Sequence, residues 1–194
     1  ASGKWHFDTE SGLEEILNRR IGENEICVMQ VCRGYVEAQR EYSLRDWDGD
    51  GVMEYAQLLR SSPGKRDGLY WESQGSDEQS PLGVLVAQAK LNRHDVQELS
   101  TTAAPYHGYW YKIITTQSGS APGGEYNYVI NGNMVAGVAL LAVPVEWGST
   151  GIMTFMVNAN GIVYEKNLGK DTTNIAERID SCALDDTWTR VTGE

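Results

Sequence analysis

The sequence predicts a single α+β domain, in which helices come before and after a mostly antiparallel sheet. Asn131-Gly132 and Asn160-Gly161 each separate two apolar, strand-like segments, and Asn-Gly supplies the positive φ angles that tight hairpin turns require. Between Val28 and Tyr42, apolar residues recur every three or four positions, which is typical of an amphipathic helix. The 194 residues contain no internal repeat and no low-complexity linker, so we interpret residues 1–194 as one domain.

Residues 1–104 are expected to be mainly helical, apart from a short strand at 4–8. Ser11 and Glu14 form a capping-box pattern, which predicts a short helix that ends near Gly22. Asn24 is then expected to cap a longer helix that packs on the sheet. Its apolar stripe consists of Val28, Val31, Cys32, Tyr35, Ala38 and Tyr42.

Two further helices are expected in this part, one from Met53 to Arg60 and one from Ser80-Pro81 to about Leu91. A small strand at 69–71 lies between them. Residues 105–169 predict a meander of about five strands. Residues 135–142 are apolar at every position, so this strand should be covered on both faces. Residues 170–194 predict a helix from Asp171 or Thr172 to about Ser181, followed by a tail.

Composition excludes several classes of function. The formal net charge of −11 opposes binding to nucleic acid or to anionic membranes, and no apolar run is as long as a membrane span. The three cysteines do not form a CxxC or CxxCH pattern, which excludes the common zinc, thioredoxin-like and c-type haem sites.

Short segments in a fixed order along nearly the whole chain resemble one family. The segments are 19–25, 38–42, 46–57, 63–71, 105–109, 121–126, 151–155 and 161–164. Together they resemble the bacterial domain-of-unknown-function family 2950, whose members are exported. The resemblance implies an extracytoplasmic location (periplasm, cell envelope or secreted) and no particular activity. Residues 183–186 depart from the family's Asp-Pro-Asp pattern. A helix followed by an antiparallel meander is also similar to the globular heads of pilins and pseudopilins, as an analogy of fold.

One motif predicts a calcium site. Aspartates alternate at three positions, a Gly follows, and an acidic residue comes three later, as at the start of an EF-hand loop. The predicted ligands are Asp46, Asp48, Asp50, the backbone carbonyl of Val52, and Glu54. The closing position is Gln57, which lacks a bidentate carboxylate, so we expect weak affinity, on the order of 10⁻⁴ to 10⁻³ M, and a structural role. The alternative is a solvated Asp-Gly turn.

An oxidising compartment would allow a disulfide, and we expect Cys182 to pair with a cysteine of the long helix. Cys27 and Cys32 are about 140° apart around a helix and should not pair with each other. Cys32 lies on the core stripe, so Cys27 is the better candidate.

Catalytic signatures are weak. His107 could serve as a general base in a hydrolase, but no Ser or Cys has the context of a nucleophile elbow. An enzyme would need His107, Asp67, Glu72 or Glu125 to meet in one cleft. Residues 119–124 are rich in Gly but lack the Lys-Ser/Thr ending of a phosphate loop. Seven aromatic residues could instead form a surface for sugars or peptides: Tyr106, Tyr109, Trp110, Tyr111, Tyr126, Tyr128 and Trp147.

The sequence therefore favours an exported structural or binding module with a structural calcium site. The alternatives are a self-assembling, pilin-like subunit of a fibre or envelope complex, and a hydrolase that uses His107. A binding module would expose an aromatic patch, whereas a self-assembling subunit would expose a sheet edge or a large apolar surface. A protein partner or a homo-oligomer is compatible with this interpretation.

Overall fold

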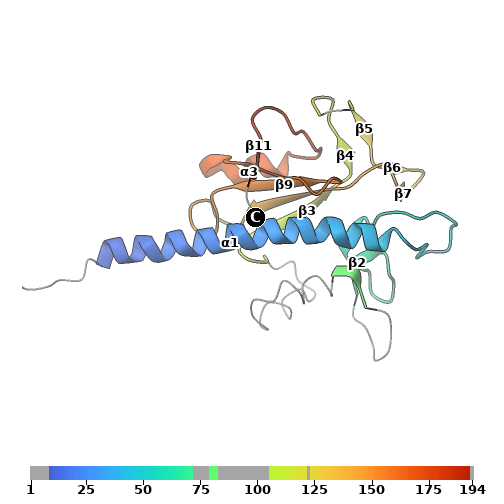
Figure 1. The fold of residues 1–194 in the computed structure, drawn as a ribbon, viewed down its shortest axis with the longest axis horizontal. Coiled ribbons are helices and arrows are strands. Elements are labelled where there is room, and N and C mark those ends of the chain that lie inside the picture. Colours follow the sequence, from blue (N-terminus) through green and yellow to red (C-terminus); the bar gives the residue numbers. More distant parts are fainter. Residues whose placement is uncertain (1–8, 72–78, 83–104, 122, 193–194) are drawn as a thin grey trace, which may run out of the picture.

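The structure, a computed structural model, describes residues 9–71, 79–82, 105–121 and 123–192. It has the predicted α+β architecture, in which a long N-terminal helix, α1 (Thr9–Tyr42), lies across a five-stranded antiparallel sheet (Figure 1). The order of the strands is β11-β10-β9-β8-β3. Their bounds are β3 Tyr109–Ile114, β8 Ala139–Pro144, β9 Thr154–Asn158, β10 Val163–Lys166 and β11 Thr189–Arg190.

The prediction of two N-terminal helices separated at Gly22 is wrong, because α1 continues through this residue for 34 residues in all. A Gly inside a helix costs about 1 kcal/mol relative to Ala, which contacts outside the helix can outweigh. Arg20 donates a 3.0 Å hydrogen bond to the Ser149 carbonyl, and Asn24 donates one of 2.8 Å to the Thr150 carbonyl. These bonds hold the backbone on both sides of Gly22.

The meander is confirmed in outline, but its strands are arranged differently from the prediction. The fifth strand of the sheet, β11, comes from the C-terminal tail and not from residues 105–169. Between β3 and β8 the chain forms two small ribbons instead. One pairs β4 (Thr116–Gln117) with β5 (Tyr126–Asn127), and the other pairs β6 (Val129–Ile130) with β7 (Asn133–Met134).

Both Asn-Gly turns are confirmed. Asn131 and Gly132 have φ angles of 53° and 94° and join β6 to β7. The second turn joins β9 to β10, where the Gly161 N–H donates a 2.9 Å hydrogen bond to the Asn158 carbonyl. In this turn Gly161 has a φ of 76°, but Asn160 is not among the residues with positive φ, so the positive φ expected at both positions is found only in the first turn.

Strand β8 is the centre of the core, as its apolar sequence predicts. All four residues from Ala139 to Ala142 are 0–1% exposed, although successive side chains point to opposite faces of a sheet. Helices α1 and α3 (Thr172–Glu177) both contact this strand. Burial on both faces therefore extends over 139–142, whereas Val135, before the strand, is 40% exposed.

The C-terminal helix is shorter than predicted, since α3 follows a 3₁₀ turn, η2 (Gly169–Asp171), and ends at Glu177.

The helix predicted from Met53 to Arg60 is wrong. This segment is extended: the Tyr55 N–H donates a 2.8 Å hydrogen bond to the Met134 carbonyl, and β1 (Leu58–Arg60) pairs in parallel with β2 (Gly68–Tyr70). Strand β2 confirms the small strand that was predicted at 69–71.

Pro81 and Leu82 are helical, as predicted; the rest of that helix and the strand expected at 4–8 lie outside the described residues. No helix in the described part of the chain is long and apolar enough to cross a bilayer.

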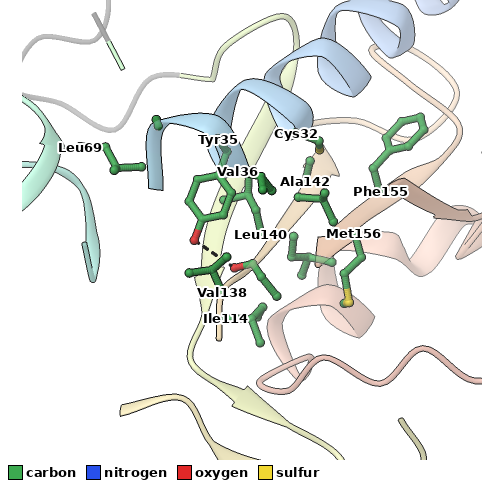
Figure 2. Close-up of a cluster of buried hydrophobic side chains, with 14 of the residues drawn as sticks. Cys32, Tyr35, Val36, Leu69, Ile114, Val138, Leu140, Ala142, Phe155 and Met156 are labelled. Atoms are coloured by element: carbon green, nitrogen blue, oxygen red, sulfur yellow. Dashed lines mark hydrogen bonds between the residues drawn. The ribbon is translucent and has the colours of Figure 1, made fainter. Parts of the chain in front are cut away.

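Figure 2 shows the core between α1 and the sheet, where Cys32, Tyr35 and Val36 lie against Leu140, Ala142 and their neighbours. One buried polar side chain, Gln39, belongs to it and is 0% exposed. Its amide donates to the Tyr35 hydroxyl (3.0 Å) and to the Ala56 carbonyl (2.8 Å), and its carbonyl oxygen accepts from the Ala56 N–H (2.8 Å). Gln39 thus fixes the chain just after the predicted calcium loop to the last turns of α1.

Candidate functional site

The acidic loop, residues 46–54, begins four residues after α1 ends at Tyr42. The structure brings together Asp46, Asp48 and Asp50, each of which offers a carboxylate oxygen within 4.8 Å of the others. Gly49 and Gly51 have φ angles of 80° and 89°, which give the loop the sharp bends that close this cluster. Three carboxylates at this separation form a ready source of oxygen ligands for a hard cation.

Backbone N–H groups of the loop orient these carboxylates. Asp46 accepts from Gly49 N–H (2.7 Å) and from Gly51 N–H (2.9 Å), one bond on each oxygen. These hydrogen bonds favour the ionised form and lower the pKa of Asp46 below its ordinary value. Asp50 accepts from Val52 N–H at 2.7 Å. A carboxylate oxygen has two lone pairs, so each of these oxygens keeps capacity for a cation.

Glu54 lies beside the cluster and not within it. Its carboxylate accepts a 3.1 Å hydrogen bond from the Met134 N–H. Desolvation raises the pKa of Glu54; the bond from Met134 opposes the shift, and the negative charges of Asp48 and Asp50 add to it. The structure therefore places Glu54 close enough to the aspartates to be repelled by them.

A network of hydrogen bonds joins the acidic loop to the β6–β7 hairpin. The Asn133 amide donates to Asp50 Oδ2 at 2.6 Å, and the Gln57 amide donates to the Gly132 carbonyl at 2.6 Å. Gln57, which occupies the closing position of the EF-hand pattern, is thus engaged with the hairpin. Sequence reasoning missed this contact, because nothing in the local pattern links the two segments.

Aromatic rings support the start of the acidic loop. Trp47 stacks on Tyr42 with ring centroids 5.6 Å apart, and it lies 5.0 Å from Trp71. The guanidinium groups of Arg45 and Arg66 lie 5.0 and 5.5 Å from the centre of the Trp47 ring. These contacts bury the apolar side of the loop and place positive charge near an otherwise acidic segment.

A second polar contact region holds α1 near its middle. Glu25 Oε1 accepts from the N–H groups of Ile152 (2.8 Å) and Met153 (2.9 Å), while the Tyr109 hydroxyl donates to the Met153 carbonyl at 2.9 Å. Burial, and then the nearby Glu25 carboxylate, raise the pKa of Tyr109 well above its ordinary value. A Cβ atom on Gly151 would lie 1.9 Å from the Tyr109 hydroxyl oxygen, so only Gly fits there.

Comparison with known families identifies the chain. A family model described as "Protein of unknown function (DUF2950)" matches residues 1–191. The chain belongs to the DUF2950 family. No curated protein and no solved structure matches it.

Segments that carry the family resemblance take part in both polar contact regions of this DUF2950 domain. Residues 19–25 of α1 contact residues 149–153, and residues 46–57 contact the β6–β7 hairpin. These segments therefore include the two polar regions that position α1 and the acidic loop.

The candidate catalytic groups of the DUF2950 domain do not converge. Gly108, next to His107, lies close to Asn24 in the middle of α1. Asp67 lies near Tyr42 at the end of this helix, where its negative charge helps to raise the pKa of the Tyr42 hydroxyl. Eighteen residues of helix separate these two points, about 27 Å. Glu125 lies beyond the opposite end of β3 from His107, and Glu72 is outside the described residues. The described groups thus occupy three separate places.

The predicted disulfide is absent, because none of the three cysteines forms one. Cys182 is buried against Tyr128, beside β4, where its backbone N–H donates a 2.8 Å hydrogen bond to the Thr116 carbonyl. Burial raises the pKa of Cys32 to about 12. The tail is therefore held by backbone hydrogen bonds and not by a covalent bond to α1.

Proposed function

We propose that this DUF2950 domain is a structural or binding module that acts outside the cytoplasm, and that its acidic loop binds a calcium ion. The proposal rests on one observation, the three carboxylates of Asp46, Asp48 and Asp50, whose oxygens lie within 4.8 Å of one another. Like charges at this distance repel, and a bound divalent cation would remove the repulsion.

The chemistry of the loop suits calcium better than a transition metal. All the candidate ligands are oxygens, and neither His nor Cys contributes to the cluster. Asp46, Asp48 and Asp50 would provide side-chain ligands, and Val52 would provide its carbonyl oxygen. Glu54 would contribute directly or through water. Few protein ligands and an incomplete EF-hand pattern give weak affinity, which suits an extracytoplasmic setting with millimolar calcium.

The role we propose for the ion is structural. Asp50 and Glu54 both bind the β6–β7 hairpin, while Gln39 holds the following residues to α1. Neutralising the acidic loop would therefore strengthen the connection between α1 and the hairpin. We do not expect the conformational opening of a calcium sensor, because the second helix of an EF-hand is replaced here by an extended segment.

Thermal melting with millimolar calcium, compared with EGTA, tests this function. A calcium concentration ten times Kd would add about 1.4 kcal/mol of stability. For a domain of this size this corresponds to a rise in Tm of about 3–6 °C. Asp48→Asn should abolish the rise, whereas Asp185→Asn, which changes the charge equally at a distant exposed turn, should leave it intact. An unchanged wild-type Tm, together with no heat in a calorimetric titration, would rule out the calcium site.

A second candidate is self-assembly through α1. The first turns of this helix extend past the sheet (Figure 1), and they expose Leu13 (63%) and Ile16 (66%). An exposed apolar stripe on a projecting helix favours association with another chain. Sedimentation of the wild type and of Leu13→Glu/Ile16→Glu tests it. A purely monomeric wild type at high protein concentration would reject this candidate.

A further inference from the structure

Two hollows adjoin at Gln117 and Tyr126, on the side of the molecule where the β4–β5 and β6–β7 ribbons lie (Figure 1). The first hollow, of about 390 Å³, lies between the β4–β5 ribbon, residues 136–138 and the β9–β10 turn. The second, of about 660 Å³, lies between the β4–β5 ribbon and Ser181. Gln117 and Tyr126 line both. We call the two hollows together the Tyr126 groove.

Tyr126 is an exposed aromatic ring on a fixed support. It is 40% exposed, and it contacts Tyr128 edge-to-face with the ring centroids 5.4 Å apart. Tyr128 is buried and rests directly on Gly137, where a Cβ atom would lie 2.9 Å from the ring. The Tyr128 hydroxyl also donates to the side-chain oxygen Oε1 of Gln117 at 3.5 Å. A ligand that stacks on Tyr126 would thus find the ring already positioned, which lowers the entropy cost of binding.

The polar side chains of the first hollow include three amides, those of Gln117, Asn158 and Asn160, together with tyrosine hydroxyls and the Cys182 thiol. Asn158 Oδ1 accepts from the Asn160 N–H at 3.1 Å, which orients the Asn158 amide and leaves its NH₂ group for a ligand. Asn160 also lines this hollow, on the turn that joins β9 to β10. Amides both donate and accept hydrogen bonds, so they match hydroxyl groups, which do the same.

The second hollow has side-chain hydroxyls, which, like amides, both donate and accept hydrogen bonds. Thr116, Ser118 and Ser181 line it, and Glu125 is the one charged side chain that the described lining of the two hollows contains. The groove thus offers no cation to an anionic ligand, in a protein whose net charge is −11. Phosphate esters, nucleotides and acidic peptides do not suit it.

We propose that the Tyr126 groove binds a neutral oligosaccharide. One sugar ring would stack its C–H face on Tyr126, with its hydroxyls on the Asn158 and Asn160 amides. The neighbouring sugar would extend toward Ser118, Ser181 and the Glu125 carboxylate, which accepts hydrogen bonds from hydroxyl groups. The volumes of the hollows fall in the range of small-ligand sites. An extended peptide fits less well, because it binds chiefly through the backbone groups of an unpaired strand, and the polar groups described here are side chains.

This inference deepens the binding role proposed above and does not depend on the acidic loop. Titrations carried out in EGTA therefore keep the two tests apart, since a failure of calcium binding leaves this result unaffected. Triacetylchitotriose, cellotriose and maltotriose would be titrated into the ¹⁵N-labelled protein, with trialanine as the peptide probe. We expect at least one trisaccharide to shift the amide signals of residues 116–128 and 158–160.

Variants then locate the site. Tyr126→Ala should weaken binding of that trisaccharide by about tenfold or more, and Tyr126→Phe should retain it, because stacking does not need the hydroxyl. Asn160→Ala should weaken it by a smaller factor. Trp110→Ala is the matched control: Trp110 is equally exposed at 41%, lies on β3, and is outside the lining of both hollows. Since Tyr126 and Asn160 are at the surface, their variants should keep the wild-type melting temperature.

Three results would overturn the proposal. The first is the absence of any shift in the groove with all three trisaccharides at millimolar concentration. The second is an equal loss of affinity in Trp110→Ala and Tyr126→Ala. The third is binding of trialanine in the groove in place of the trisaccharides, which would assign the groove to peptides.

Discussion

The side-chain amide of Asn133 donates a 2.6 Å hydrogen bond to Asp50 Oδ2, and these two residues are 83 positions apart in the chain. The bond joins the acidic loop to the hairpin that the Asn131-Gly132 turn closes. It also occupies one oxygen of a candidate calcium ligand, so the loop and the hairpin are expected to respond together to calcium. Several variants test how these and other contacts contribute.

Replacing Asn133 by Ala should loosen this connection. The bond is exposed, so we expect a loss of about 0.5–1 kcal/mol in the free energy of unfolding, near the lower end for hydrogen bonds. Urea denaturation in EGTA measures it. Asn160→Ala provides the control, because Asn160 is exposed and lies on the other Asn-Gly turn. An equal effect of the two substitutions would contradict a specific contribution from the Asn133–Asp50 bond.

Gly151→Ala should be strongly destabilising, by about 3 kcal/mol or more, because the new methyl group would overlap the buried Tyr109 side chain. Gly119→Ala is a suitable control: the nearest atom to a Cβ there is 3.9 Å away. Thermal melting of both variants decides the matter. Similar melting temperatures would show that Tyr109 can move aside.

Gln39→Leu keeps the size of a buried side chain but removes its three hydrogen bonds, two of them to the backbone of Ala56. The Ala56 N–H and carbonyl would then be buried without these partners, and each such group costs about 1–3 kcal/mol. We expect a loss of more than 2 kcal/mol by this arithmetic. Gln30→Leu, at an exposed position of the same helix, should have little effect. Urea denaturation compares the two variants, and equal stabilities would refute the role given to Gln39.

Glu54 should make stability depend on pH. Its pKa in the folded protein is raised above the ordinary value of 4.5, first by desolvation. A raised carboxyl pKa means that the folded state favours the protonated form. This contribution to stability is complete below pH 4.5 and is lost as the pH rises through the raised pKa. In EGTA, Glu54→Gln should therefore be more stable than the wild type at neutral pH, with the difference shrinking in acid.

Calcium should reverse that order if Glu54 contributes to the ion, because Gln is a weaker ligand than a carboxylate. Glu41→Gln, at an exposed position near the end of α1, makes the same change in net charge and serves as the control. Denaturation across a pH series, with and without calcium, measures both effects. A Glu54→Gln variant that is less stable than the wild type in EGTA at neutral pH would contradict the desolvation argument.

The thiols provide a further measurement. Cys32 and Cys182 are buried, and burial raises the pKa of both, so the reactive thiolate is scarce in the folded state. Both should react with a thiol reagent only in denaturant, at rates that follow unfolding. Mass spectrometry of a non-reduced digest should find three thiols, and a peptide that contains Cys182 joined to Cys27 would contradict the structure.

The local sequence was sufficient to predict the hairpin turns and the buried central strand, because neighbouring residues determine these features. Asn and Gly tolerate the positive φ angles of tight turns, which Asn131, Gly132 and Gly161 adopt, and the unbroken apolar run at 139–142 is buried in the core. The predictions that were wrong concern features determined by contacts between residues far apart in the sequence. Gly22 is a helix stop by composition, yet residues 149–153 hold the helix on both sides of it.

In the candidate site, too, local spacing could be interpreted from the sequence, whereas tertiary contacts could not. The spacing of Asp46, Asp48 and Asp50 was enough to predict that their carboxylates lie together. The docking of the loop on Asn133 depends on the tertiary structure and leaves no local signal. The sequence also pointed to Tyr126 only as one aromatic among seven. Its exposure and its neighbouring amides could not be predicted, because they come from the packing of the β4–β5 ribbon and residues 136–138 against the β9–β10 turn.

The partners of α1 also determine when this helix can become stable during synthesis. Arg20 and Asn24 donate hydrogen bonds to residues 129 and 126 positions later in the chain, and Glu25 accepts one from a residue 127 positions later. Contacts across so much sequence form late, since the intervening chain must be ordered first. A growing polypeptide that has not yet reached residue 149 therefore contains the residues of α1 without these anchors. The helix that comes first in the sequence is expected to be among the last elements to be secured.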